Sequence, residues 1–421
     1  MTRTDLRDVA GSRAGGLSSA SPLRPTTAAV SGVGANAAPR RLHLLTSSRL
    51  RTAQECPRRH LYRYELCRTP YGTSRASELG TAVHAGLEAW WVAIREGAAQ
   101  YALASALSAA EAAYPTDDAY AAALLRALVF AYDARWSEWA QTCEVIGVEV
   151  AFEAPLRHPT RRGVLARSWR VAGKIDALVR LADGRVAIIE HKTTSMDAGA
   201  GSDYRRKLTL DPQVSTYFDG AEALGIKADL CLYDVLRKPS IKPLLATPEE
   251  DRIYSQPKSR ACRECKKAEK NRAPLPHIED GLSCENGRIS TDPGGKLRSN
   301  QREHDETATQ YEARLIETIA ADPDKHLLHA EIVRSDEERE AHAWALWHAV
   351  RQIEDTRRAY RESGCDARAV PQNPGACLTR GRCDFLDVCE GTASVTDDAR
   401  FKALETAHPE LPELSHDNAT T

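Results

Sequence analysis

Two β-branched segments joined by a tight turn constrain the fold of this chain more than any other feature. Residues 168–181 and 186–192 are short, rich in valine and isoleucine, and separated by Asp183-Gly184. An Asp-Gly pair between such segments is a strong signal for a β-hairpin. We therefore expect an antiparallel pair of strands within the folded part of the chain.

This hairpin carries two carboxylates and an ammonium group. Side chains alternate across a strand, so Glu190 and Lys192 share one face while His191 points to the other. Asp176 lies on the neighbouring strand at about the same level. Two carboxylates suit a hard ion such as Mg²⁺ or Mn²⁺, and a lysine whose pKa is tuned by apolar neighbours can act on a phosphate beside them. The spacing alone is equally typical of ordinary strands that end in charged residues.

Two further motifs flank the hairpin. Upstream, a G-x-x-x-H run begins at Gly80 and ends at His84, inside a segment whose apolar periodicity predicts a helix over 77–96. Downstream, Gln213 and Tyr217 stand four residues apart, on one face of a predicted helix. Taken alone, His84 would more often be a structural histidine, and Gln213 and Tyr217 would be surface and core positions.

The order G-x-x-x-H, G-x-x-D, E-x-K, Q-x-x-x-Y resembles the RecB-type branch of the PD-(D/E)xK nucleases over about residues 47–217. Where many relatives carry Asp-Tyr-Lys, this chain has Glu-His-Lys, and since either acid can ligate a metal, activity is still expected. The resemblance implies metal ligands His84, Asp176, Glu190 and the carbonyl of His191, catalytic residues Asp176, Glu190 and Lys192, and DNA contacts Gln213 and Tyr217.

The order of the predicted helices and strands along the chain indicates an α/β fold. We expect a mixed central β-sheet flanked by helices, the restriction-endonuclease-like core that the resemblance also implies, with an N-terminal helical region. The first helix is capped at Thr46-Ser47-Ser48 and runs through Leu50, Leu61 and Tyr64. Helices are predicted over 101–114, 118–140, 212–224, from about 307, and over 335–360, and strands over 145–156, 168–181, 186–192, 229–236 and 327–334.

The resemblance implies one nuclease domain over 42–400 with a catalytic core at about 143–238, and the composition adds an inserted polar loop without regular periodicity at about 239–306. Residues 1–41 read as a disordered tail, with a mitochondrial presequence fitting less well, and residues 401–421 as a loose tail. No run of about 18 apolar residues occurs, so no membrane span is expected. Residues 1–41 also lack the apolar core of a secretory signal, so the chain is expected to be cytoplasmic.

Eleven cysteines in a chain that is expected to be cytoplasmic indicate metal ligation rather than disulfides. Cys56 lies early, and Cys377, Cys383 and Cys389 are spaced C-x5-C-x5-C near the end. Thiolates are the normal ligands of a [4Fe–4S] cluster, and one early cysteine with three late ones resembles the iron–sulfur clasp of RecB-type nucleases. Scattered buried thiols are the alternative.

A second set of metal-binding side chains lies in the insertion. Cys262-x2-Cys265 with His277 and Cys284 could hold Zn²⁺, although the last two ligands are irregularly spaced. Unliganded thiols in a loop are the alternative.

The function expected from the resemblance is that of a DNA exonuclease acting on ends or single strands, in recombination, repair or phage DNA processing. Basic and aromatic residues interleave after Cys56, which makes Arg58, Arg59 and Arg63 candidate DNA contacts, although a solvated basic face fits as well. No Walker A sequence is present, so a helicase or recombination partner would be a separate chain. The alternative function is a non-catalytic iron–sulfur or zinc-containing DNA-binding module, which requires the loss of a metal ligand, and none is missing.

Overall fold

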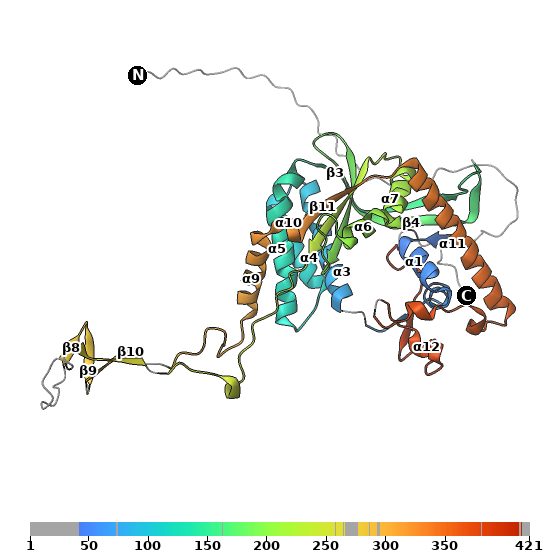
Figure 1. The fold of residues 1–421 in the computed structure, drawn as a ribbon. Helices are drawn as coiled ribbons and strands as arrows, with labels where there is room; N and C mark the ends of the chain where they lie inside the picture. The colour runs from blue at the N-terminus through green and yellow to red at the C-terminus, as the bar shows by residue number, and fades with distance from the viewer. Residues whose placement is uncertain are drawn as a thin grey trace, which may run out of the picture. The chain divides into compact units, whose positions relative to one another are not determined.

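A six-stranded mixed β-sheet organises the structure, a computed structural model (Figure 1). The structure describes residues 42–414 except 73–74, 162, 257, 264, 266–276, 286, 293–294, 380 and 412–413. The predicted disordered tail over 1–41 lies outside these residues. The strands pair in the order β1-β4-β5-β6-β11, with β3 on the other edge of β4. They are β1 (His43–Leu45), β3 (Glu144–Arg157), β4 (Leu165–Arg180), β5 (Val186–Thr194), β6 (Leu230–Arg237) and β11 (Leu327–Ile332).

The pairing directions confirm the predicted hairpin and mixed sheet. Strands β4 and β5 are antiparallel, with Ala177 opposite Ile189, whereas β5 and β6 are parallel. The turn closes through a 2.8 Å hydrogen bond from the Leu181 N–H to the Arg185 carbonyl. Gly184 adopts φ +89° there, a left-handed conformation that glycine tolerates best.

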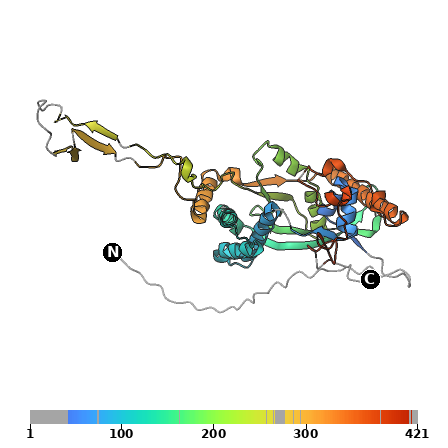
Figure 2. The ribbon, with the colours of Figure 1, turned by 90° about the horizontal axis from the view of Figure 1, so that it is seen from below.

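Helices cover both faces of the sheet (Figure 2). Alternate residues of β5 face opposite cores: Ile189 packs with α3 (Arg75–Arg95), α4 (Ala102–Ala113) and α5 (Ala119–Gln141), and Ile188 packs with α7 (Pro212–Ala223). Against the amino-terminal half of β4 lie α1 (Ser47–Glu55) and the long helix α11 (Asp336–Glu362). Apart from two short elements after α1, the remaining helical elements of the described residues are η2 (Ala99–Tyr101), α6 (Asp203–Thr209), η3 (Glu249–Asp251), α9 (Ala308–Ala321), α10 (Pro323–His326), η4 (Ala367–Ala369), η5 (Pro374–Ala376) and α12 (Leu386–Glu390).

The first helix is shorter than predicted. Thr46 caps it as expected, accepting a hydrogen bond from the Arg49 N–H at 3.2 Å. The helix ends at Cys56, which is extended (φ −159°), before α2 (Pro57–His60) and the π-helical turn η1 (Leu61–Glu65). The prediction of one helix through Tyr64 is therefore wrong, because a residue that precedes proline disfavours the helical conformation.

The carboxy-terminal segment is also more ordered than predicted. Strand β12 (Phe401–Ala403) pairs with β2 (Arg68–Pro70), and the Phe401 ring stacks on Phe385 at 5.3 Å between centroids. Leu411 is 1% exposed and packs with Leu44. The expectation of a loose tail from 401 is thus wrong as far as Leu411, because these apolar side chains bury themselves against the folded domain.

The insertion has a regular structure that the sequence did not predict. Its strands β7 (Lys258–Ala261), β8 (His277–Glu279), β9 (Leu282–Glu285) and β10 (Arg288–Asp292) form a separate four-stranded antiparallel sheet, which lies along the chain between β6 and α9; β8, β9 and β10 are labelled in Figure 1. The strands are too short and too polar for a periodicity signal. Among the described residues, no helix has the length and apolar character that a membrane span requires.

Candidate functional site

The two carboxylates of the hairpin lie together at neighbouring strands. Glu190 on β5 is only 2% exposed. The backbone N–H of His191 donates to Asp176 Oδ2 at 2.8 Å, which ties the β4 carboxylate to β5. Burial, and then the charge of Glu190, raise the pKa of Asp176 to about 8. Two carboxylates so placed favour a neighbouring cation.

Lys192 supplies one such positive charge. Its Nζ contacts Glu190 Oε1, as strand alternation predicts, and donates to Gln213 Oε1 at 3.0 Å. Burial alone would lower the pKa of Lys192, but the adjacent Glu190 carboxylate raises it above its usual value. The lysine is therefore a charged ammonium group in this arrangement, because Glu190 and the neighbouring carboxylates Asp176 and Asp211 together outweigh the effect of burial on its pKa.

Helix α7 presents Gln213 and Tyr217 to the site. Asp211 caps the helix by accepting from the Gln213 N–H at 3.0 Å, and one turn later the Gln213 Nε2 donates to the Tyr217 hydroxyl at 2.6 Å. The Tyr217 ring packs edge-on against Phe152. A Cβ on Gly173 would lie 2.8 Å from that Phe152 ring, which explains the glycine of the G-x-x-D run. The side chains of Lys192, Gln213 and Tyr217 thus form one continuous chain of hydrogen bonds.

His84, on α3, lies beside the carboxylate of Asp176. Its Nδ1 lies 3.5 Å from Asp176 Oδ2, and the side chain is 35% exposed. Burial, and then the neighbouring His191 and Lys192, lower the pKa of His84 to about 3, so the imidazole is neutral at pH 7 and can offer a lone pair to a metal. A Cβ on Gly80 would lie 3.3 Å from Thr193 Oγ1, so glycine lets α3 approach β5 closely.

His191 places its ring behind the site, on the face opposite to Glu190, as predicted. Its Nδ1 lies 3.2 Å from Oδ2 of Asp234 on β6, which is fully buried, and His329 Nε2 lies 3.6 Å from the other oxygen. Only the carbonyl of His191 is thus a candidate metal ligand. Sequence reasoning missed Asp234, although an aspartate within the apolar run 230–236 was a signal, because a buried charge requires a partner.

We expect Asp234→Ala to lower the free energy of unfolding by about 3–5 kcal/mol at pH 7, because it leaves His191 buried without its partner. Burial alone would raise the pKa of Asp234, but contact with His191 holds it below its usual range. A lowered carboxyl pKa stabilises the fold above the unfolded value, and this stabilisation is lost as the pH falls through the folded value. Urea unfolding should therefore show the difference shrinking below about pH 4.

The matched control for this variant is Glu331→Ala, which removes an exposed carboxylate paired with Arg185. An exposed ion pair contributes about 0–1 kcal/mol. Equal destabilisation by the two variants would contradict a stabilising role for the buried Asp234–His191 pair.

The types of donor atom, rather than their present spacing, suit a hard divalent cation, since the ligand atoms of the described His84, Asp176 and Glu190 do not all lie within 4.8 Å of one another. Among the described residues, Glu190 Oε2 is a buried oxygen without a hydrogen-bond partner. It belongs to the same group as Asp176 and the neutral imidazole of His84. Oxygen ligands of this kind suit Mg²⁺ or Mn²⁺, and a cation would satisfy the orphaned oxygen and favour the ionised form of Asp176.

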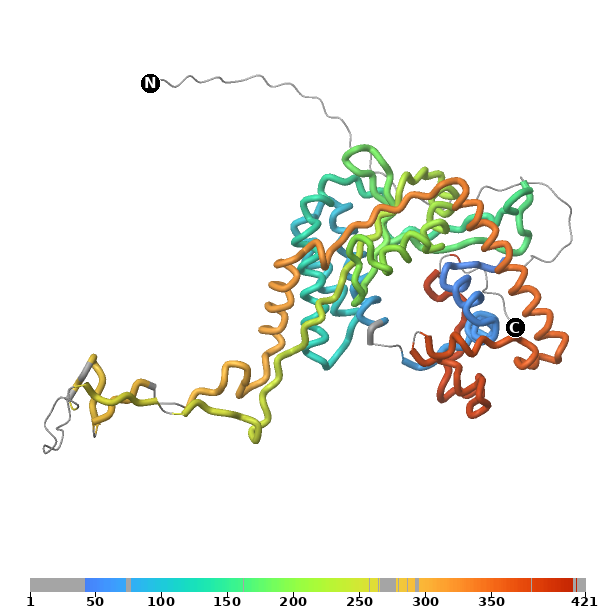
Figure 3. The backbone as a smooth tube through the Cα atoms, in the orientation of Figure 1, coloured from blue at the N-terminus to red at the C-terminus, as the bar shows by residue number. Residues whose placement is uncertain are grey.

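The early and late cysteines lie in one region of the structure, where the blue and red ends of the tube meet in Figure 3. The Arg58 N–H donates to the Pro371 carbonyl at 3.1 Å, beside Cys56. Burial raises the pKa of the Cys389 thiol, and the nearby Cys56 thiol adds to the rise. Among these four described cysteines, no three thiols lie within 4.8 Å of one another as ligands of a single ion would.

The candidate DNA-contacting arginines engage other protein groups. Arg58 Nε donates to the Val370 carbonyl at 3.0 Å, and Arg59 lies 3.6 Å from Glu55. Arg63 stacks over the Tyr64 ring and donates to the Ala407 carbonyl at 3.4 Å. A second basic group, Arg205, Arg206 and Lys207 on α6, follows β5 directly in the chain.

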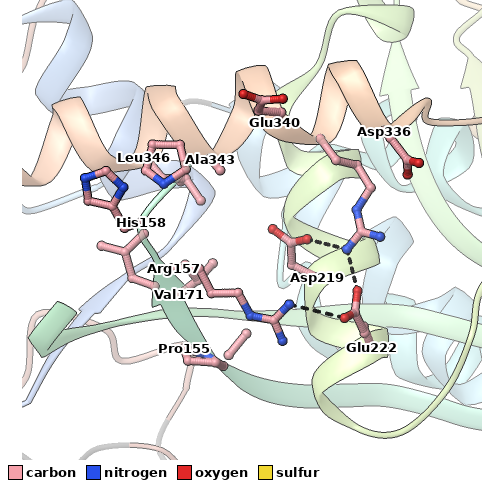
Figure 4. Close-up of a pocket in the computed structure, with 14 residues that line it drawn as sticks. Pro155, Arg157, His158, Val171, Asp219, Glu222, Asp336, Glu340, Ala343 and Leu346 are labelled. Carbon is pink, nitrogen blue, oxygen red and sulfur yellow. Dashed lines mark hydrogen bonds and ion pairs between the residues drawn. The ribbon is translucent and has the colours of Figure 1, made fainter. Parts of the chain in front are cut away.

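A pocket of about 320 Å³ lies between β3, α7 and α11 (Figure 4). Several of its charged groups are paired with one another: Arg339 binds Asp219 at 2.8 Å and Glu222 at 2.6 Å, and Arg157 lies 3.3 Å from Glu222. The residues that line it include none of the carboxylate–lysine group. This pocket is therefore separate from the candidate site.

Comparison with known proteins identifies one family. The model described as "PD-(D/E)XK nuclease superfamily" matches residues 44–390, a span that includes the whole central sheet except its first residue, both flanking helix groups and all four of the early and late cysteines. No curated protein matches the chain.

Proposed function

Because the chain belongs to the PD-(D/E)XK nuclease superfamily, we propose that it is a metal-dependent DNA nuclease, an exonuclease that acts on DNA ends or single strands. The observation that carries the proposal is the buried, unpartnered Oε2 of Glu190 beside Asp176 and Lys192. A nuclease needs a cation at this position, and a second carboxylate, Asp176, and the ammonium of Lys192 lie beside this oxygen.

Each residue of the site has a separate role in the proposed cleavage reaction. Asp176, Glu190 and His84, with the carbonyl of His191, would hold Mg²⁺ or Mn²⁺, which when bound polarises the scissile phosphodiester and activates water. Lys192 brings a fixed positive charge to the developing negative charge of the phosphate. Gln213 keeps the ammonium in place, and Tyr217, whose pKa burial raises well above its usual value, remains a neutral partner of Gln213.

Two basic groups are the candidate paths for the DNA backbone. Gln213 and Tyr217 lie at the reacting centre, and α6 with Arg205, Arg206 and Lys207 precedes them in the chain. The Arg58 side chain already donates to a backbone carbonyl, that of Val370. We therefore propose that the basic side chains of α6 bind most of the DNA phosphates, with Arg59 and Arg63 making additional contacts.

We propose further that Cys56, Cys377, Cys383 and Cys389 bind a [4Fe–4S] cluster that joins the first helices to the carboxy-terminal segment. The proposal is supported by the proximity of Cys389 to both Cys56 and Cys383, which brings together cysteines from the two ends of the folded chain, and by the preference of such clusters for four thiolates. A separate helicase or recombination protein is the proposed partner, and recombination, repair or phage DNA processing the proposed process.

Digestion of labelled DNA tests the proposed activity. Linear single- and double-stranded DNA, labelled at either the 5′ or the 3′ end, is incubated with Mg²⁺ or Mn²⁺ and with EDTA as control. We expect nucleotides or short fragments from linear DNA, no reaction with EDTA, and intact closed circles. Cleavage of circles at the same rate would make the protein an endonuclease, and DNA binding without cleavage in either metal would favour the non-catalytic alternative.

A further inference from the structure

Three cysteines of the inserted sheet converge on one point. Cys262 follows β7, Cys265 comes three residues later, and Cys284 lies in β9, yet their Sγ atoms all lie within 4.8 Å of one another. Among the described residues, no other group of three or more histidine, cysteine, aspartate and glutamate side chains is gathered as closely. The nuclease site does not use these thiols, which belong to a different sheet.

The distances match a tetrahedral metal site. With Zn–S bonds of about 2.3 Å, a tetrahedron holds its sulfurs about 3.8 Å apart. The Sγ atoms of Cys265 and Cys284 are 3.7 Å apart, which is well beyond the about 2.05 Å of a disulfide. The Cys265 N–H also points at Cys262 Sγ, with a donor–acceptor distance of 3.5 Å. A backbone donor to sulfur stabilises a thiolate, the form that binds metal.

Among the described residues, the inserted sheet buries few side chains other than these cysteines. Its buried cluster consists of Cys262, Cys284 and Ile289, with Cys265 partly buried against them. The other large apolar side chains face solvent, since Ile278 is 71% and Leu282 42% exposed. Units below about 40 residues usually need disulfides, a metal or oligomerisation, and this sheet spans only residues 258–292. Two buried thiols add little apolar surface to so small a core. They would stabilise the inserted sheet mainly by binding a metal.

We propose that the inserted sheet is a zinc-binding module in which Cys262, Cys265 and Cys284 provide three thiolates to one structural Zn²⁺. The sequence offers His277 as the fourth ligand, and its backbone is paired with that of Cys284 in the β8–β9 ladder. The module is independent of the iron–sulfur cysteines and of the catalytic metal.

Metal analysis of the full-length protein tests this site. Protein purified anaerobically under reducing conditions should contain about one zinc per chain, and Co²⁺ in its place should give the intense visible bands of tetrahedral thiolate coordination. The double variant Cys265→Ser/Cys284→Ser should lose both the zinc and the cobalt bands while its iron content is unchanged. His277→Ala should keep zinc but release it at a lower chelator concentration.

The controls separate this site from the others. Cys143→Ser, a thiol outside both cysteine sets that contacts the Trp139 carbonyl, should leave zinc unchanged. Limited proteolysis should cut the wild-type protein within 258–292 only after zinc is chelated. A wild-type protein that binds no zinc or cobalt at these thiols would overturn the proposal, as would a Cys265–Cys284 disulfide in the reduced preparation or zinc retained by the double variant.

Discussion

Replacing Glu190 with glutamine should abolish DNA cleavage, lowering the rate by about a thousandfold or more. Glutamine keeps the size of the side chain but removes the charge that pairs with Lys192 and would bind the cation. Asp176→Asn should have a similar effect, and Lys192→Ala should reduce the rate without removing the metal. Rates are measured on end-labelled DNA at saturating Mg²⁺ or Mn²⁺, and metal affinity by calorimetry on the same preparations.

The folding of these variants distinguishes catalytic groups from structural ones. Since burial and Glu190 raise the pKa of Asp176 to about 8, the metal-free fold loses stability as the pH rises from about 4 to 8 and this carboxyl ionises. Asp176→Asn should therefore make the metal-free protein more stable at pH 8, and more so than at pH 5. Asp197→Asn, at an exposed carboxylate paired with Arg237, is the matched control and should leave rate and stability unchanged. Wild-type cleavage by Glu190→Gln would refute the proposed site.

The carboxylate–lysine group could be predicted from sequence because its geometry is local. Strand alternation and one Asp-Gly turn suffice to place Glu190 and Lys192 on one face, His191 on the other and Asp176 on the neighbouring strand, and the structure has each of these arrangements. The short-range signals that set these positions are a period of two and a turn that requires a positive φ.

The features missed by sequence depend on distant or weak signals. Asp234 meets His191 only because β5 and β6 pair in parallel, a register that no local pattern specifies. The break at Cys56 was readable from Pro57, but the apolar periodicity on both sides masked it. The inserted sheet buries thiols instead of aliphatic side chains, so its strands lack the alternation by which strands are usually found.

Removing one ligand of the proposed iron–sulfur clasp should have the largest effect on stability. Anaerobically purified wild-type protein should be brown and contain about four iron and four sulfide per chain, and Cys383→Ser should be colourless and iron-free. By analogy with crosslinks that close long loops, the loss should lower the free energy of unfolding by about 3–5 kcal/mol. Iron, sulfide and urea unfolding are measured on the same samples.

The effect is expected to be large because the cluster would crosslink the two ends of the folded chain at the edge of the apolar core that they share. Their shared core is small, with Tyr62 against Phe385 at 5.2 Å as its central contact, and Cys383 and Cys389 pack at its edge. Without the cluster, this region should open before the central sheet, so proteolysis should first release the segment after α11. Cys365→Ser, an exposed cysteine outside both metal sets, is the control and should keep colour and stability. An iron-free wild-type protein as stable as the reconstituted one would show that packing alone joins the two ends.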